Sequence, residues 1–181
     1  MKIKTLLIAN RGEIACRIAR TARASGITPV GVHSQADANA LHVREIGQSV
    51  CIGAGPASES YLKIDAVIAA AKSVGADAIH PGYGFLAENS DFARAVEAAG
   101  MIFMGPTPDT LDRFGDKASA KEAAVAASVP VISGAEGARS DPEQIAEEVR
   151  QMGLPVLLKA VGGGGGRGQR LVTPHGGQRR G

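Results

Sequence analysis

Near its carboxyl end the sequence reads Val156-Leu-Leu-Lys-Ala-Val-Gly-Gly-Gly-Gly-Gly-Arg-Gly168, an apolar strand-like run that ends at Lys159 and opens into five consecutive glycines. Glycine has no Cβ, so the backbone N–H groups of this run can close around a phosphate. Lys159 would supply a positive charge for the same anion. Two interpretations stand at this point: a movable flap over a nucleoside triphosphate, or a flexible linker.

Strand and helix signals alternate upstream of this run. Apolar stretches predict buried strands at residues 3–9, 28–33, 49–52, 76–80 and 101–104. Amphipathic stretches predict intervening helices at residues 13–24, 41–46, 60–74 and 91–99. This alternation predicts an α/β fold with a parallel, doubly wound sheet.

A domain boundary is expected at Gly105-Pro-Thr-Pro108, because helical signals then recur at residues 109–114 and 116–127 without an intervening strand. Residues 129–132 begin a second set of elements. This set comprises a helix at 141–152, capped by Asp141 with Pro142 in its first turn, a strand at 156–160, the glycine run and a strand at 169–173.

Composition excludes several classes of function. The chain has 181 residues, of which 44% are hydrophobic and 3% aromatic, and its formal charge is +2. So small a charge with so few aromatic residues argues against a nucleic-acid partner, and no apolar run approaches membrane-spanning length. Cys16 and Cys51 are interpreted as small core residues of a protein in a reducing compartment, the cytoplasm.

The turn after the first strand, Ala9-Asn-Arg-Gly-Glu-Ile14, contains one glycine where a dinucleotide-binding fingerprint has three. A structural turn is therefore favoured over an NAD site. The glycine run is not a Walker A loop either, because Gly166-Arg-Gly-Gln169 lacks the required Lys followed by Ser or Thr.

A second constellation is His80-Pro-Gly-Tyr-Gly-Phe-Leu-Ala-Glu-Asn89, directly after a predicted strand. Ligands gather at the carboxyl ends of parallel strands, so this loop can bring backbone and polar groups close to a ligand. A turn with Phe85 in the core, and with Asn89 or Ser90 capping the next helix, is the alternative.

Four motifs, taken in order, closely resemble the N-terminal part of biotin carboxylase, the ATP-grasp component of biotin-dependent carboxylases. They are Ile8-Ala-Asn-Arg-Gly-Glu-Ile-Ala15, the segment of residues 80–89, Phe114-Gly-Asp-Lys117, and Lys159-Ala-Val-Gly-Gly-Gly-Gly-Gly-Arg-Gly168. The resemblance covers residues 3–172. It implies a Rossmann-like N-terminal (pre-ATP-grasp) domain at residues 1–114, the start of an ATP-grasp domain at 115–172, and an atypical tail at 173–181.

The resemblance also implies roles for individual residues. Tyr83 and Gly84 would line the biotin and carboxyphosphate side of the site. ATP would be bound by Lys117, Lys159, Gly162, Gly163, Gly164, Gly165, Gly166, Gly168 and Gln169. The family usually has a small polar residue where this chain has Val161 and a methionine where it has Gln169.

In this family ATP and bicarbonate form carboxyphosphate, and the carboxyl group passes to carrier-bound biotin. Expected partners are therefore a biotin carboxyl carrier and a carboxyltransferase, and the family commonly forms homodimers. The glutamates that hold Mg²⁺ and a Glu-x-Asn-x-Arg motif have no counterpart in this sequence, and no catalytic residue is assigned. The expectation is a catalytically incomplete fragment, with a non-catalytic nucleotide- or subunit-binding module or another ATP-grasp ligase as alternatives.

Overall fold

The computed structural model describes residues 2–115, 117–132, 134, 139–160 and 168–174. The chain divides into two compact units, Met1–Asp112 and Arg113–Gly181.

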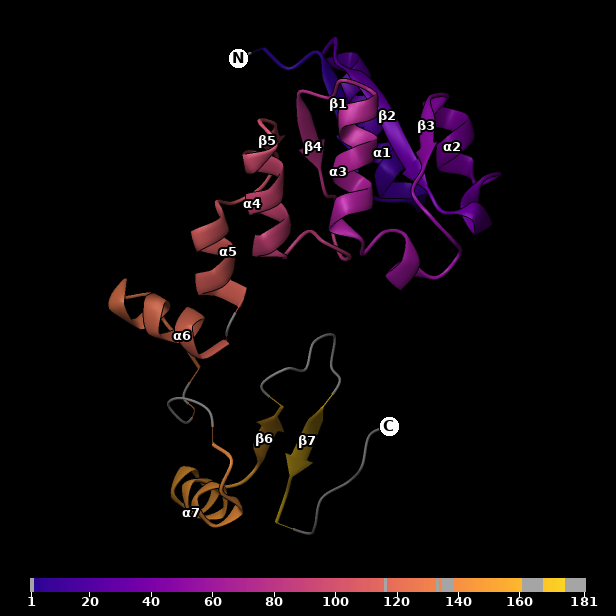
Figure 1. The fold of residues 1–181 in the computed structure, drawn as a ribbon. Helices are drawn as coiled ribbons and strands as arrows, with labels where there is room; N and C mark the ends of the chain where they lie inside the picture. Colours follow the sequence, from indigo (N-terminus) through magenta and orange to yellow (C-terminus); the bar gives the residue numbers. More distant parts are fainter. Residues whose placement is uncertain (1, 116, 133, 135–138, 161–167, 175–181) are drawn as a thin grey trace. The chain divides into compact units, whose positions relative to one another are not determined.

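The first unit is built on a parallel sheet of five strands (Figure 1). In chain order these are β1 (Thr5–Ile8), β2 (Thr28–His33), β3 (Ser49–Cys51), β4 (Ala78–His80) and β5 (Ile102–Phe103). Their order across the sheet is β3-β2-β1-β4-β5, and every neighbouring pair is parallel. The chain therefore winds outward from β1 on one side, then returns to the other side through β4. This reversal makes the carboxyl ends of β1 and β4 the topological switch point, where ligands bind in open α/β sheets.

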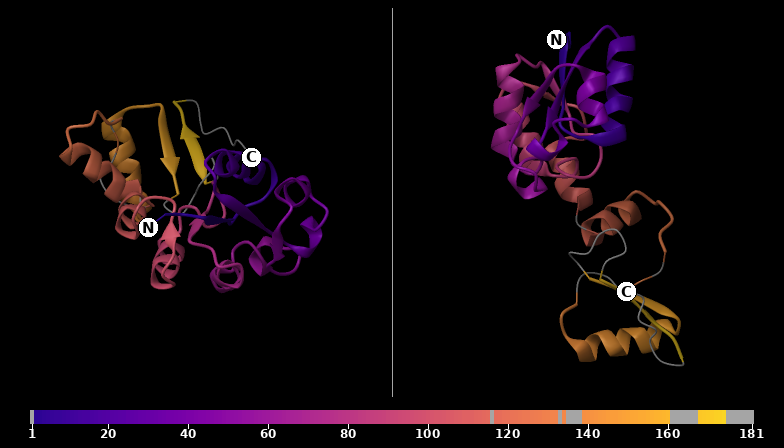
Figure 2. Two further views of the ribbon diagram at one scale, coloured as in Figure 1. Left: turned by 90° about the horizontal axis from the view of Figure 1, so that it is seen from above. Right: turned by 90° about the vertical axis from the view of Figure 1, so that its right-hand side faces the viewer.

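Helices cover both faces of this sheet (Figure 2). They are α1 (Gly12–Ala24), α2 (Leu41–Ile46), α3 (Ile64–Ser73) and α4 (Ser90–Ala98), with short 3₁₀ turns η1 (Gln35–Asp37) and η2 (Ala57–Glu59). Leu6 and Ile8 of β1 face α1 and α2, whereas Leu7 faces the core that contains α3 and α4. Alternate residues of one strand thus serve two cores, which confirms the α/β, doubly wound prediction.

Two predictions within this unit need correction. The helix predicted at residues 60–74 begins only at Ile64, because Ser60 lies in a tight turn and its Oγ donates to Pro56 O at 2.9 Å. Cys16 is buried as predicted, but Cys51 is exposed. Since Cys51 lies on β3, the edge strand of the sheet, its apolar surroundings in sequence do not place it in the core.

The second unit contains mostly local structure. Helix α5 (Pro108–Gly115) crosses the division between the units, and α6 (Lys117–Ala126), α7 (Pro142–Met152), β6 (Val156–Lys159) and β7 (Gln169–Val172) follow. The Asp141 carboxylate accepts a hydrogen bond from Glu143 N at 3.0 Å, which confirms the predicted cap of α7. Residues 129–132 form neither a helix nor a strand.

Candidate functional site

The β1 and β4 ends are joined by the side chain of Asn10. Asn10 follows β1 and is only 4% exposed. Its Nδ2 donates to Pro81 O at 2.7 Å and to Tyr83 O at 2.9 Å, both in the loop after β4. Its Oδ1 accepts from Arg11 N at 2.9 Å. One amide therefore fixes the loop of residues 80–84 to the first strand, across the switch point.

Tyr83 reaches outward from this loop. Its side chain is 62% exposed, and its hydroxyl donates to Oε1 of Glu13 in the first turn of α1. That hydrogen bond to a carboxylate raises the pKa of Tyr83. Gly84, the other residue predicted on this side, has a φ of +68° and no neighbour within 4 Å of an ideal Cβ. The structure thus brings Tyr83 and Gly84 to the surface of the switch point.

The loop continues as a turn that also serves the core. Leu86 is buried, and Phe85 stacks on Tyr61 with ring centroids 4.9 Å apart. Oδ1 of Asn89 accepts from Phe92 N at 2.7 Å and so caps α4. The two interpretations of residues 80–89 are therefore compatible, because the first half lies at the switch point and the second half begins a helix.

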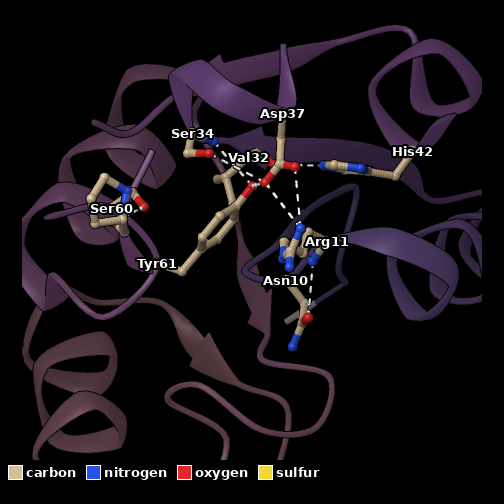
Figure 3. A network of polar contacts seen from close by, with 9 residues as sticks. Asn10, Arg11, Val32, Ser34, Asp37, His42, Ser60 and Tyr61 are labelled. Carbon is tan, nitrogen blue, oxygen red and sulfur yellow. Dashed lines mark hydrogen bonds and ion pairs between the residues drawn. The ribbon is translucent and has the colours of Figure 1, made fainter. Parts of the chain in front are cut away.

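A polar cluster beside Asn10 was missed by the sequence analysis (Figure 3). The Asp37 carboxylate accepts hydrogen bonds from Tyr61 OH at 2.6 Å, from Ser34 Oγ at 3.2 Å and from Arg11 Nη1 at 3.2 Å. Burial alone would raise the pKa of Asp37, but the Tyr61 hydrogen bond, the Arg11 charge and the Ser34 hydrogen bond outweigh it and lower the pKa. The same burial, followed by the bond to Asp37, raises the pKa of Tyr61 to about 12.

The Asp37 cluster occupies a position that binds the ribose of a dinucleotide in Rossmann domains. A Rossmann site uses an acidic residue after its second strand to bind ribose hydroxyls, and Asp37 follows β2. In this chain both carboxylate oxygens are engaged by protein side chains. The adjoining cavity, lined in part by Arg11, Tyr61 and Phe85, measures about 160 Å³, whereas sites for drug-sized ligands span roughly 300–1,000 Å³. The Asp37 carboxylate is therefore held by the protein's own side chains, as a structural brace.

The second candidate region is the β6–β7 hairpin. The strands are antiparallel, with Lys159 paired to Gln169, and Ala160 N donates to Gly168 O at 2.8 Å. Gly168 has a φ of +70°, and a Cβ there would lie 2.8 Å from the Cβ of Ala160. Ala160 and Gly168, the described residues nearest to the glycine run, are thus held together at the end of a strand ladder.

Some of the residues predicted to bind ATP lie in the described part of the chain and others lie outside it. Lys159 and Gln169 are exposed at the end of the hairpin that carries the glycine run. Lys117 is the first residue of α6, and its side chain lies outside the described part of the structure. Val161, Gly162, Gly163, Gly164, Gly165 and Gly166 lie outside the described residues, as does the segment 175–181.

Comparison with known proteins identifies the family. The profile of the biotin carboxylase N-terminal domain matches residues 2–111, more than half of the chain. The chain belongs to the biotin carboxylase family. The ATP-binding domain of the carbamoyl-phosphate synthase L chain also matches, at residues 116–177. The family predicted from the four sequence motifs is therefore confirmed.

Individual biotin carboxylases agree closely in sequence. The biotin carboxylase of Pseudomonas aeruginosa is 52% identical over 171 residues, which are 94% of this chain and 38% of that protein. The alpha subunit of the mitochondrial methylcrotonoyl-CoA carboxylase of Oryza sativa is 49% identical over 170 residues, or 94% of this chain and 23% of that protein. The chain thus spans well under half the length of these relatives.

Two similar solved structures were determined with nucleotides. Biotin carboxylase from Campylobacter jejuni, in a βγ-ATP complex, has a TM-score of 0.91 and 46% identity over 95% of this chain and 39% of that chain. The biotin carboxylase domain dimer of Hydrogenobacter thermophilus 2-oxoglutarate carboxylase, solved with MgADP, ADP and bicarbonate, has a TM-score of 0.90 and 43% identity over 96% of this chain and 38% of that chain. Within the described part of the present chain, no helix is long and apolar enough to cross a membrane.

Proposed function

We propose that this chain supplies the N-terminal domain and the nucleotide flap of a biotin carboxylase, which uses ATP and bicarbonate to carboxylate carrier-bound biotin. The observation that carries the proposal is 52% identity to a biotin carboxylase over 94% of the chain. We divide the chain into the N-terminal domain at residues 1–114, the first part of the ATP-grasp domain at 115–172 and a tail at 173–181.

The hairpin is proposed to hold ATP. Lys159 stands exposed where β6 leads into the glycine run, so its ammonium group can neutralise phosphate charge. The close approach of Gly168 to Ala160 leaves no room for a side chain at the base of the run, which suits a loop whose backbone approaches a ligand. Gly162, Gly163, Gly164, Gly165 and Gly166 would close over the phosphates, Gln169 would border the adenine, and Lys117 would contribute a second charge.

Tyr83 and Gly84 are proposed to line the biotin side. In the described residues, neither of their backbone N–H groups has a hydrogen-bond acceptor. Two adjacent free N–H groups at a switch point can bind a carbonyl or a carboxylate oxygen. A biotin carboxyl carrier, a carboxyltransferase and a second copy of the chain are the proposed partners.

The described residues contain no group of three or more His, Cys, Asp or Glu side chains that could hold a metal ion. The chain spans 38% of its biotin carboxylase relative. The role that we propose for its own residues is the binding of nucleotide.

Calorimetric titration with ATP tests the nucleotide site. Lys159→Ala should weaken ATP binding roughly tenfold, since it removes one charge-assisted contact to phosphate. Lys72→Ala, which removes an exposed lysine from the last turn of α3, is the matched control and should bind ATP as the unmodified chain does. A folded, unmodified chain that gives no heat of ATP binding would refute the proposal.

A further inference from the structure

The link between Asn10 and the loop after β4 is made entirely by donation. Both hydrogens of the Asn10 amide are used, one on Pro81 O at 2.7 Å and the other on Tyr83 O at 2.9 Å. An ionised aspartate of the same size can only accept hydrogen bonds. In Figure 3 the Asn10 side chain extends away from Asp37, so its amide belongs to the loop and not to the Asp37 cluster. The position therefore requires an amide.

Gly82 lies between the two carbonyls and fits closely against the same amide. Its φ is +67°, and a Cβ there would lie 2.7 Å from Nδ2 of Asn10. Gly82 N donates to Nδ1 of His80 at 3.0 Å. Burial lowers the pKa of His80 and so favours the neutral ring, whose Nδ1 can accept this bond. The loop is thus held on one side by Asn10 and on the other by His80.

We propose that Asn10 is a positioning residue for biotin: its amide fixes the backbone at Tyr83, so that the N–H groups of Tyr83 and Gly84 face the ligand in one conformation. The proposal rests on the proposed function, which assigns the biotin side to these two residues. Asn10 itself is buried and reaches the ligand only through the loop. Preorganising a loop in its bound conformation strengthens binding by lowering the entropic cost of ordering it.

Amide hydrogen exchange on the ¹⁵N-labelled chain tests whether Asn10 holds the loop. The reporters are Gly82 N–H, bonded to His80, and Ala87 N–H, bonded to Gly84 O at 2.9 Å. Asn10→Asp should raise their exchange rates roughly tenfold or more, because two hydrogen bonds are lost. Asn89→Asp is the matched control, since Asn89 acts as an acceptor that aspartate replaces. Unchanged exchange in Asn10→Asp would overturn the proposal.

A biotin titration of the same samples shows whether Asn10 orders the loop for biotin binding or only stabilises the loop. We expect free biotin to shift the Tyr83 and Gly84 amide resonances of the unmodified chain. Asn10→Asp should weaken biotin binding at least tenfold, while ATP binding stays within twofold. Equal biotin affinity in a variant with a loosened loop overturns the positioning role. No biotin response in the unmodified chain instead refutes the proposed biotin site itself, so the two failures are distinct.

Asn10→Ser provides the second variant if Asn10→Asp does not fold. Serine is too short to reach both carbonyls and introduces no charge, so the folded variant should show the same loss of protection and of biotin affinity. Equal exchange rates and equal biotin affinity in Asn10→Ser and the unmodified chain would count as refutation. The circular dichroism spectrum of each variant establishes that the α/β fold is intact before the comparison is made.

Discussion

The two units use apolar residues very differently. In the first unit the strands and helices enclose two cores, and residues such as Leu7, Ile79 and Phe92 are fully buried. In the second unit Ala123 is the one apolar residue buried among those described, while Leu157 and Leu171 of the hairpin are 45% and 41% exposed. Pairing between its two strands is the main interaction that the described residues show for the hairpin, whereas the sheet is stabilised by burial on both faces. Tertiary burial and local hydrogen bonding can therefore be tested separately in one chain.

The largest effect is expected from a pair of substitutions, one in each unit. Phe92 is fully buried and packs edge-on against Phe103, with centroids 5.8 Å apart. Phe92→Ala should cost about 3–5 kcal/mol of unfolding free energy, because it leaves a cavity in the core. Leu157→Ala, at a half-exposed position, should cost less than about 1 kcal/mol. Urea unfolding followed by amide resonances from each unit measures both, and equal costs would break the comparison.

Two glycines with positive φ sharpen the comparison within the first unit. Gly82→Ala should cost about 3 kcal/mol, from left-handed backbone strain together with the contact on Asn10. Gly100, with a φ of +78° and open space around an added Cβ, is the control. Gly100→Ala should cost only about 1 kcal/mol, which is the backbone strain alone. Thermal unfolding of both variants gives the difference, and identical values would mean that the approach to Asn10 is not tight.

Removing one hydroxyl from the Asp37 cluster should have a moderate effect. Tyr61 OH donates to Asp37 and accepts from Ser34 N at 3.0 Å. Tyr61→Phe keeps the stack on Phe85 but leaves the buried Ser34 N–H without its acceptor, at a cost of about 2 kcal/mol. Tyr83→Phe, at an exposed phenol, serves as the control and should leave the unfolding midpoint unchanged. A midpoint for Tyr61→Phe equal to that of the unmodified chain would argue against the brace.

The smallest effect is a pH dependence. His42 is buried, its Nε2 lies 3.2 Å from Val32 O, and burial lowers its pKa below 6.5. As pH falls below 6.5 the unfolded chain takes up a proton before the folded one does, so stability decreases until the lower folded pKa is passed. The loss is the free energy that corresponds to the difference between the folded and unfolded pKa values of His42. His42→Gln should flatten this part of the stability curve, measured by urea unfolding between about pH 7 and pH 5. A curve of unchanged slope would show that His42 does not titrate differently in the two states.

Local patterns predicted much of this structure. The alternation of strands and helices, the Asp141 cap and the strands around the glycine run depend on neighbouring residues, so the sequence displays them directly. The cluster of Asp37, Tyr61 and Arg11 depends on contacts between residues 24 and 26 positions apart, and no spacing rule indicates such partners. Cys51 was misplaced for a related reason, since edge position follows from strand order and not from composition.

In the candidate site, too, some residues could be predicted from the sequence and others only from the structure. The roles of Tyr83 and Gly84 follow from the family resemblance, whereas Lys159 is also indicated by its place before the glycine run. The roles of all three residues stay predictions. Asn10 lay inside a quoted motif, yet its importance became visible only when β1 and β4 were found side by side. The sequence shows an asparagine directly after an apolar strand, but it does not show which groups the asparagine binds. Those groups are known only once the loop after β4 is placed beside β1.

The bridge made by Asn10 also has a consequence for the order of events during synthesis. Asn10 emerges from the ribosome 71 and 73 residues before the two carbonyls that it will bind. Domains fold as units during translation, and contacts so distant in sequence form late because a long segment must first be ordered. The first strand and α1 can therefore collapse early, while the loop that carries Tyr83 takes its shape only after β4 has been added beside β1.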